Sequence, residues 1–264
     1  MDDGYPPPGT GPDWRRMGEL AGCESRPVMR IERVAEEALG GTFAEFRERV
    51  RKEVASARRR GFAGLKTIAA YRTGLDIAAP NPAAAEDAFG AAASTKRLDA
   101  KPLLELALWD ALEANEADPL PLQIHAGFGD SDLFLPRVQP GYLKPLIERF
   151  DDTPFVLLHC YPYVREAGWL AHVYGHVFFD LSLTIPHVSR PTAALREALE
   201  LAPFSKLLYA SDAARTPELY FLAATRWRDV LATVLPELLG DDAEEAGRAI
   251  LRENARRLYR LAGS

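Results

Sequence analysis

The sequence predicts an α/β protein with a parallel sheet, and three observations support this prediction. Short apolar segments that fit buried strands alternate with segments that fit amphipathic helices along the 264 residues. Strands that are joined through helices form right-handed crossovers, which makes the strands parallel. Three of the apolar segments, 121–127, 154–162 and 206–213, also carry a His or an Asp near their C-terminal ends. In parallel α/β barrels, active sites are built at this end of the strands.

Six segments have the pattern of strands. The segment PFVLLHCYP at 154–162 is the clearest, because a continuous apolar run bounded by prolines fits a strand buried on both faces. The first segment alternates apolar and polar residues after Pro27 and would place Arg30 and Glu32 on one face. The predicted strands are 26–34, 64–71, 121–127, 154–162, 177–183 and 206–213.

The segments between the strands have the apolar spacing of helices. Thr42, followed by Glu45, forms a capping box at the start of the clearest helix, and Gly61 ends it. Asp13 is the expected cap of a short helix near the N-terminus. The predicted helices are 13–20, 42–60, 78–116 with a break near 94–97, 141–150, 165–174, 190–201, 217–235 and 241–261.

Spacing alone allows two architectures. Six strand–helix units fit an open doubly wound sheet, and they equally fit six of the eight units of a barrel. Neither an internal repeat nor a low-complexity linker interrupts the sequence. We therefore expect residues 1–264 to form a single domain.

Composition excludes several classes of protein. The chain is 47 % hydrophobic and 27 % charged, with a net charge of −6. The acidic balance argues against a nucleic-acid partner, and no apolar run reaches the roughly 20 residues of a membrane helix. The first residues lack the basic and apolar regions of a signal peptide, and two cysteines are too few for a disulfide framework. We expect a cytoplasmic protein that acts on a small molecule, without a nucleic-acid or membrane partner.

Three strand-end side chains are the main candidates for chemistry: His125, His159 and Asp212. Imidazole nitrogens and a carboxylate form a mixed donor set that suits zinc or manganese. A metal held in this way lowers the pKa of a bound water, and a neighbouring Asp or His accepts the proton. The alternative interpretation is that these are unrelated strand-end residues.

The order QIH, LLHCYP, LYASD and ENARRLY resembles the metal-dependent amidohydrolase superfamily. The segment GLKTIAAYRTGL at 64–75 is similar to the branch sometimes fused to glutamine synthetase. The resemblance implies a (β/α)8 barrel in which His125 is a metal ligand. It implies that His159 is a ligand or a group that polarises the substrate carbonyl. Asp212 would bind metal and transfer a proton.

One motif of that superfamily is absent. Its first strand ends in His-x-His, whereas none of the five histidines here precedes His125. In the family order, the six predicted strands are numbers three to eight, and residues 1–5 look like the tail of the second. The expected fold is thus an incomplete, N-terminally truncated TIM-type barrel with strands 1 and 2 missing. Its outer strands would expose unpaired edges, which favour pairing with another chain, so homo-oligomerisation is left open.

Four further residues are candidates for substrate binding: Lys66, Arg30, Arg72 and His187. The resemblance places Lys66 on the fourth strand, where a lysine is carbamylated and bridges two metals in some relatives. Alternatively, its ammonium binds a substrate carboxylate, or it simply extends to solvent. Arg30 and Arg72 suit bidentate carboxylate binding, although ordinary surface ion pairs also explain them. His187 follows the seventh strand, on the catalytic side in the family layout.

These observations predict a hydrolase that cleaves an amide-type C–N bond of a small molecule with metal-activated water. The metal is expected to be zinc, with manganese as the alternative. Asp212 would transfer the proton, while His159 polarises the carbonyl or holds the metal. A decarboxylase of the same superfamily, a non-catalytic remnant that binds a small carboxylate, and an unrelated open-sheet protein are the alternatives. The hydrolase would need its missing His pair from upstream sequence.

Overall fold

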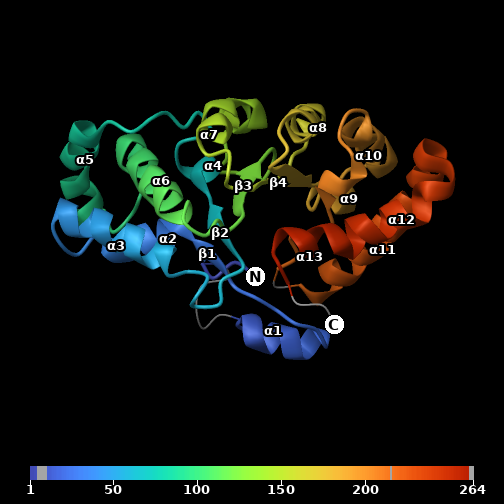
Figure 1. Ribbon diagram of the computed structural model, residues 1–264, viewed down its shortest axis with the longest axis horizontal. Coiled ribbons are helices and arrows are strands. Elements are labelled where there is room, and N and C mark those ends of the chain that lie inside the picture. The colour runs from blue at the N-terminus through green and yellow to red at the C-terminus, as the bar shows by residue number, and fades with distance from the viewer. Residues whose placement is uncertain (5–10, 215, 262–264) are drawn as a thin grey trace. The chain divides into compact units, whose positions relative to one another are not determined.

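The computed structural model describes residues 1–4, 11–214 and 216–261 (Figure 1). Its six strands follow one another in chain order, β1 to β6, in one sheet. The registered neighbours are parallel, with Val28 opposite Gly64 and Phe155 opposite Val177. Consecutive parallel strands joined through helices are the arrangement of a TIM-type barrel. The α/β class and the incomplete barrel predicted from the sequence are thus confirmed.

The chain divides into two compact units, one of residues 1–124 and 145–153, the other of residues 125–144 and 154–264. The N-terminal unit contains α1 (Trp14–Ala21), β1 (Val28–Arg30), α2 (Ile31–Ala38), α3 (Phe43–Ala55), β2 (Gly64–Thr67), α4 (Ala69–Arg72), α5 (Pro82–Thr95), α6 (Lys101–Asn115), β3 (Leu122–Ala126) as far as Ile124, and most of α7 (Lys144–Arg149). The prediction of a single domain remains a prediction.

Helix α3 shows how the N-terminal unit is built. Thr42 and Glu45 form the predicted capping box, with the Thr42 side chain accepting from the Glu45 amide. The buried residues Phe46, Val50 and Val54 recur at helical spacing and face the core. Arg47, next to this face of the helix, makes two hydrogen bonds of 2.8 and 2.9 Å to the buried carboxylate of Asp110 on α6. This ion pair ties α3 to α6.

The segment predicted as a strand over 26–34 is largely helical. The strand β1 ends at Arg30, and α2 begins at Ile31. The apolar residues Ile31, Val34, Ala35 and Ala38 are buried at helical spacing, so the same letters that alternate over a short window also satisfy a longer helical period. The sequence pattern had placed Glu32 on the face of a strand, but in the structure it lies on helix α2.

The outer edge of β1 has a backbone partner. Asp2 forms a parallel bridge with Val28. The Val28 amide donates to the Met1 carbonyl at 2.7 Å, and the Asp3 amide donates to the Val28 carbonyl at 3.0 Å. Residues 1–3 thus pair as an additional strand would, which agrees with the resemblance of residues 1–5 to a strand tail; Tyr5 lies outside the described residues.

The C-terminal unit contains the end of β3, β4 (Phe155–His159), α8 (Val164–Val173), β5 (Val177–Asp180), α9 (Thr184–His187), α10 (Pro191–Leu199), β6 (Leu207–Leu208), α11 (Pro217–Leu239), α12 (Ala243–Arg248), a π-helix (Ala249–Glu253) and α13 (Asn254–Leu258). Short 3-10 turns lie at Leu135–Val138, Pro140–Leu143, Phe204–Lys206 and Gly240–Asp242. Strand β4 is buried at all five positions, as its continuous apolar run predicted. On one face of the sheet, Val156, Leu158 and Leu208 pack with Leu258 and Tyr259.

Three other predicted strands end early in the structure. The segment 64–71 forms a strand only at Gly64–Thr67, and Ala69–Arg72 is helical. The segment 206–213 forms a strand only at Leu207–Leu208, and the segment 177–183 only as far as Asp180. Asp212 therefore lies in a loop beyond the strand.

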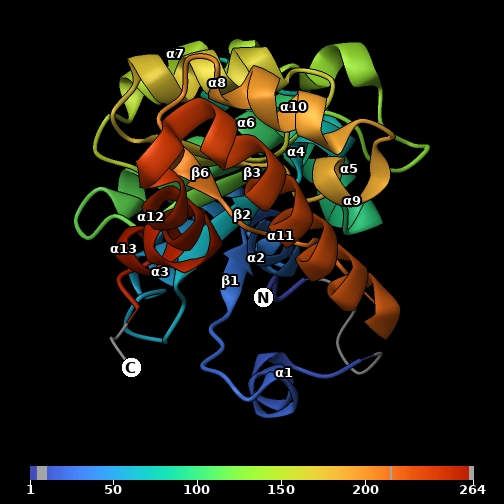
Figure 2. The same cartoon turned by 90° about the vertical axis from the view of Figure 1, so that its right-hand side faces the viewer.

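The outer edge of β6 is covered by the C-terminal helices (Figure 2). The Tyr209 amide donates to the carbonyl of Ile250 at 3.0 Å. Ile250 lies in the π-helix, whose irregular turn leaves carbonyls available for other donors. The Asn254 side chain donates to the carbonyls of Phe204 and Leu207, each at 2.8 Å. At these positions the outer strands have partners, contrary to the expectation of unpaired edges.

Across the described ranges, no helix combines the length and the apolar character that crossing a bilayer requires.

Candidate metal and catalytic site

The C-terminal unit brings two of the candidate residues into contact. His125 is the second-to-last residue of β3, and His159 is the last residue of β4. Their ring centroids are 4.4 Å apart, and both side chains are buried. The Cys160 amide donates to the Ala126 carbonyl at 3.0 Å, which holds the two strand ends together.

Gly127 allows these strand ends to approach so closely. It has a φ of +79°, in the left-handed region that favours glycine. A Cβ at this position would overlap the Tyr161 carbonyl oxygen and lie 2.8 Å from the Cys160 carbonyl carbon. The next residue, Phe128, donates its amide to that same oxygen at 2.7 Å. The QIHAG segment thus needs glycine directly after its His–Ala pair.

Three polar residues at and just after the end of β5 hold His159. The His159 amide donates to Asp180 Oδ1 at 2.8 Å, and its Nδ1 lies 2.6 Å from Ser182 Oγ. The Thr184 hydroxyl donates to the His159 carbonyl at 2.5 Å. Asp180, Ser182 and Thr184 are buried. Our sequence reasoning missed them, although a buried Asp at the end of VFFD is the same strand-end signal that identified His125 and His159.

Asp212 reaches His159 from the loop after β6. Its Oδ2 lies 3.9 Å from His159 Nε2, and its side chain is 41 % exposed. Three of the five described non-glycine residues with positive φ belong to this site: His159 at 69°, Cys160 at 66° and Asp212 at 47°. A residue in a sparsely populated backbone conformation of this kind costs on the order of 1–3 kcal/mol, and such residues are enriched at functional sites.

The donor set fits a divalent metal by its chemistry. Two imidazoles and a carboxylate suit zinc or manganese, and His125, His159 and Asp212 are the residues that would hold such an ion. His125, His159 and Asp212 meet as two contacting pairs. The part of the chain that the structure describes contains no group of three His, Cys, Asp or Glu side chains placed to hold a metal.

Cys160 is a buried structural residue. It is fully buried, and its thiol donates to the Leu157 carbonyl. Burial raises the pKa of the Cys160 thiol well above its ordinary value, and the nearby Asp180 charge raises it further. The nucleophilic thiolate is therefore not formed at neutral pH.

In the N-terminal unit, Arg30 and Lys66 converge on one carboxylate. Arg30 binds Asp2 through Nε and Nη2, and Lys66 Nζ lies 3.3 Å from Asp2 Oδ2. Burial acts to raise the pKa of Asp2, but the charges of Lys66 and Arg30 outweigh it and lower the pKa overall. This pair is therefore suited to binding carboxylates, and in this chain Asp2 supplies the carboxylate.

Of the other two candidates, Arg72 has its own ion-pair partner and His187 is exposed. Arg72 pairs with Glu36 at 3.1 Å within the N-terminal unit, which matches the interpretation of an ordinary ion pair. His187 is exposed at the end of the short helix α9. The roles of Arg72 and His187 in substrate binding remain predictions.

Glu32 is a buried carboxyl group near the end of β2. Its Oε1 accepts from the Thr67 hydroxyl at 2.5 Å and from the Ile68 amide at 2.9 Å. Among the described residues, Oε2 has no hydrogen-bond partner. Burial raises the pKa of Glu32 above its ordinary value near 4.5.

We expect this raised pKa to make the stability of the protein depend on pH. The folded state retains the Glu32 proton at pH values where the unfolded chain has lost it, so stability falls as pH rises from about 4.5 through the folded-state pKa. Denaturant unfolding of wild type and Glu32→Gln between pH 4.5 and 8 measures this. The stability of wild type relative to the variant should fall with rising pH; a flat or rising difference would contradict the assignment.

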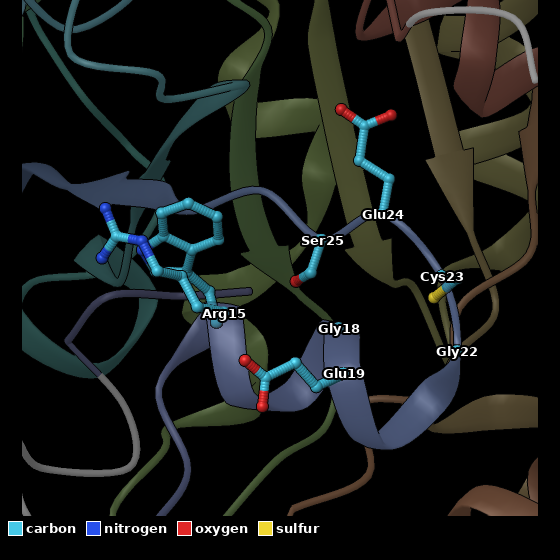
Figure 3. A pocket seen from close by; sticks show the side chains of 8 residues that line it. Arg15, Gly18, Glu19, Gly22, Cys23, Glu24 and Ser25 are labelled. Carbon is cyan, nitrogen blue, oxygen red and sulfur yellow. The ribbon is translucent and has the colours of Figure 1, made fainter.

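A shallow hollow also lies beside α1 (Figure 3). Its walls come from α1 and the loop that follows it, with Arg15, Glu19, Cys23 and Ser25 around it. Gly18 packs closely there, since a Cβ would lie 2.9 Å from the Cys23 carbonyl oxygen. No candidate residue lines this hollow.

Comparison with known proteins identifies the family. The amidohydrolase family model matches residues 44–261, a span that contains β2 to β6 and the His125, His159 and Asp212 positions. The chain belongs to the amidohydrolase family, as the QIH, LLHCYP and ENARRLY motifs predicted.

Individual relatives support this assignment. Protein fluG of Emericella nidulans is 38 % identical over 220 residues, which are 75 % of this chain and 25 % of fluG. The chain thus spans about a quarter of that relative. A crystal structure described as a metal-dependent hydrolase from Lactobacillus casei is 34 % identical, with a TM-score of 0.89 over 94 % of this chain and 69 % of that one. Uronate isomerase of Thermotoga maritima, 14 % identical with a TM-score of 0.65 over 92 % of this chain and 64 % of its own, shares the fold.

Proposed function

We propose that this chain carries the strand-end catalytic groups of a metal-dependent hydrolase that cleaves an amide-type C–N bond of a small molecule. The observation that supports the proposal most is the contact of His159 with both His125 and Asp212. These are the residues that carry the resemblance to the amidohydrolases. A relative of the same fold, at 34 % identity, is described as a metal-dependent hydrolase.

The residues divide the chemistry between them. His125, His159 and Asp212 would hold a divalent metal, zinc first and manganese as the alternative, which supplies an activated water when bound. Asp212 is the partly exposed member of the set, so its carboxylate can accept a proton from water and pass it to a leaving amine. His125 and His159 are buried, which keeps their rings in place as Asp212 exchanges protons.

A second candidate function has its own supporting observation. Arg30 and Lys66 already bind the Asp2 carboxylate in the N-terminal unit, so a remnant without catalysis that binds a small carboxylate is the main alternative. An external carboxylate would have to displace Asp2. Decarboxylation, which uses the same metal-site residues in this superfamily, is the variant within the enzyme class.

Metal content tests the proposal directly. The protein is purified without chelator, and zinc and manganese per chain are measured by elemental analysis. Binding of zinc to the chelator-stripped protein is then measured by calorimetry. We expect about one tightly held ion per chain, lost in His125→Ala and in Asp212→Ala because each removes one donor from a small set.

His172→Ala is the matched control, since His172 is exposed on α8 and outside the site. Its metal content should equal that of wild type. Absence of metal from the wild-type protein, or equal loss in His172→Ala, would argue against the hydrolase and favour the carboxylate-binding remnant. A metal-loaded protein would next be assayed on N-acyl amino acids, with amine release separating hydrolysis from carbon dioxide release by a decarboxylase.

A further inference from the structure

His159 is held at three points by one short segment. Asp180 accepts from its amide at 2.8 Å, Ser182 contacts its ring at 2.6 Å, and Thr184 donates to its carbonyl at 2.5 Å. We refer to Asp180, Ser182 and Thr184 as the β5 clamp. All three side chains are at most 3 % exposed. The clamp explains how a residue with a φ of +69° keeps a defined position.

The clamp also determines which ring nitrogen carries the proton. A carboxylate oxygen only accepts hydrogen bonds, so the Ser182 hydroxyl uses its one hydrogen to donate to Asp180 Oδ1 at 2.7 Å. The remaining lone pairs of Ser182 Oγ then accept from His159 Nδ1–H. In a neutral imidazole the other nitrogen is unprotonated. His159 Nε2, which lies 3.9 Å from Asp212, therefore presents a lone pair.

We propose that the β5 clamp fixes His159 as the Nδ1–H tautomer, so that Nε2 acts as a lone-pair donor in the site. A lone pair beside the carboxylate of Asp212 attracts an electrophile, a metal ion or a water proton. Polarisation of a carbonyl oxygen would instead require a proton on Nε2. The clamp thus selects the ligand role of His159 over the carbonyl-polarising role, and Asp180, Ser182 and Thr184 are positioning residues.

This assignment rests on the proposed function only for the identity of the electrophile. The tautomer itself is a property of the metal-free protein and can be measured without substrate. The two claims therefore fail separately.

The test is nitrogen NMR of the imidazole rings at pH 8. Protein with ¹⁵N-labelled histidine is stripped of metal, and long-range ¹H–¹⁵N correlations report which nitrogen of each ring is protonated. The His159 signals are assigned by their loss in His159→Gln. We expect protonated Nδ1 and unprotonated Nε2. In Ser182→Ala, where the acceptor for Nδ1–H is gone, the signals should move to the Nε2–H form or to an average of both tautomers.

Two matched variants separate positioning from general damage. Ser182→Thr keeps the hydroxyl and should retain the Nδ1–H pattern. Ser56→Ala removes a hydroxyl that donates to Glu53 in the N-terminal unit and should leave the His159 signals unchanged. An Nε2–H or doubly protonated His159 in wild type, or the same spectrum in a folded Ser182→Ala, would overturn the assignment. If Ser182→Ala fails to fold, the wild-type tautomer alone decides.

Zinc titration of the same samples connects the clamp to the proposed function. Removal of a partner that orients a metal-bound histidine typically weakens affinity about 10–100-fold, which is the loss we expect for Ser182→Ala. An Nδ1–H tautomer that depends on Ser182 in a protein that binds no zinc would confirm the clamp and refute the metal site. Equal zinc affinity with an unchanged tautomer would refute the clamp alone.

Discussion

Substitution of Gly127 by Ala is expected to destabilise the protein by about 2–5 kcal/mol. A left-handed φ costs a residue with a Cβ about 1–2 kcal/mol, and the new Cβ overlaps the backbone of Cys160 and Tyr161. Forcing extra volume into a packed region adds about 1–3 kcal/mol. The strand ends would separate, so the contact of His125 with His159 should be lost as well. Denaturant unfolding and zinc titration measure the two effects.

Gly61→Ala is the matched control for this prediction. Gly61 also has a positive φ, of 89°, but a Cβ added there meets nothing within 4 Å. It should show the backbone cost of about 1–2 kcal/mol alone and leave metal affinity unchanged. If Gly127→Ala destabilised no more than Gly61→Ala, the close approach of the two strand ends would not be tight.

Substitution of Asp180 by Ala should have a cost of similar size. One oxygen of Asp180 accepts from the His159 amide, the Ser182 amide and the Ser182 hydroxyl. A buried donor that loses its acceptor costs about 1–3 kcal/mol, and three donors lose theirs together. We expect a loss of at least about 3 kcal/mol in the free energy of unfolding, measured by urea denaturation.

Asp13→Ala is the comparison variant for Asp180. Asp13 caps α1 and accepts from the Arg16 amide at 2.8 Å at an exposed position. Loss of such a cap costs about 1 kcal/mol, because water replaces the lost acceptor. Equal effects of the two substitutions would mean that the three donors around Asp180 find other acceptors when its carboxylate is removed.

The sequence predicted the elements that depend on local patterns. The capping box at Thr42, the cap at Asp13 and the buried strand before His159 are found as expected, because the residues that specify each one lie within a few positions of it. Where a pattern was short, it was ambiguous. The stretch around Ile31 alternates over a few residues, as a strand would, but is buried on one face of a helix. Only its packing partners in the folded protein distinguish the helix from the strand.

The sequence named candidates for the site, and their roles remain predictions. His125, His159 and Asp212 could be named because each follows an apolar run at the end where parallel strands place their ligands. The β5 clamp could not be named, because hydrogen bonds between His159 and Asp180, Ser182 and Thr184, some 20 positions later, leave no periodic signal. The engagement of Lys66 and Arg30 with Asp2 is equally long-range.

The sequence by itself thus determined the α/β class, the alternation of strands and helices, the family and the choice of three strand-end residues as candidates. All of these depend on local periodicity and short motifs. Tertiary structure alone decided the conformation around these residues. The left-handed backbone of His159 and Asp212, the close approach at Gly127 and the contact of Ser182 with the His159 ring arise from contacts between segments far apart in the chain. Such contacts form only when the sheet brings the ends of its strands together.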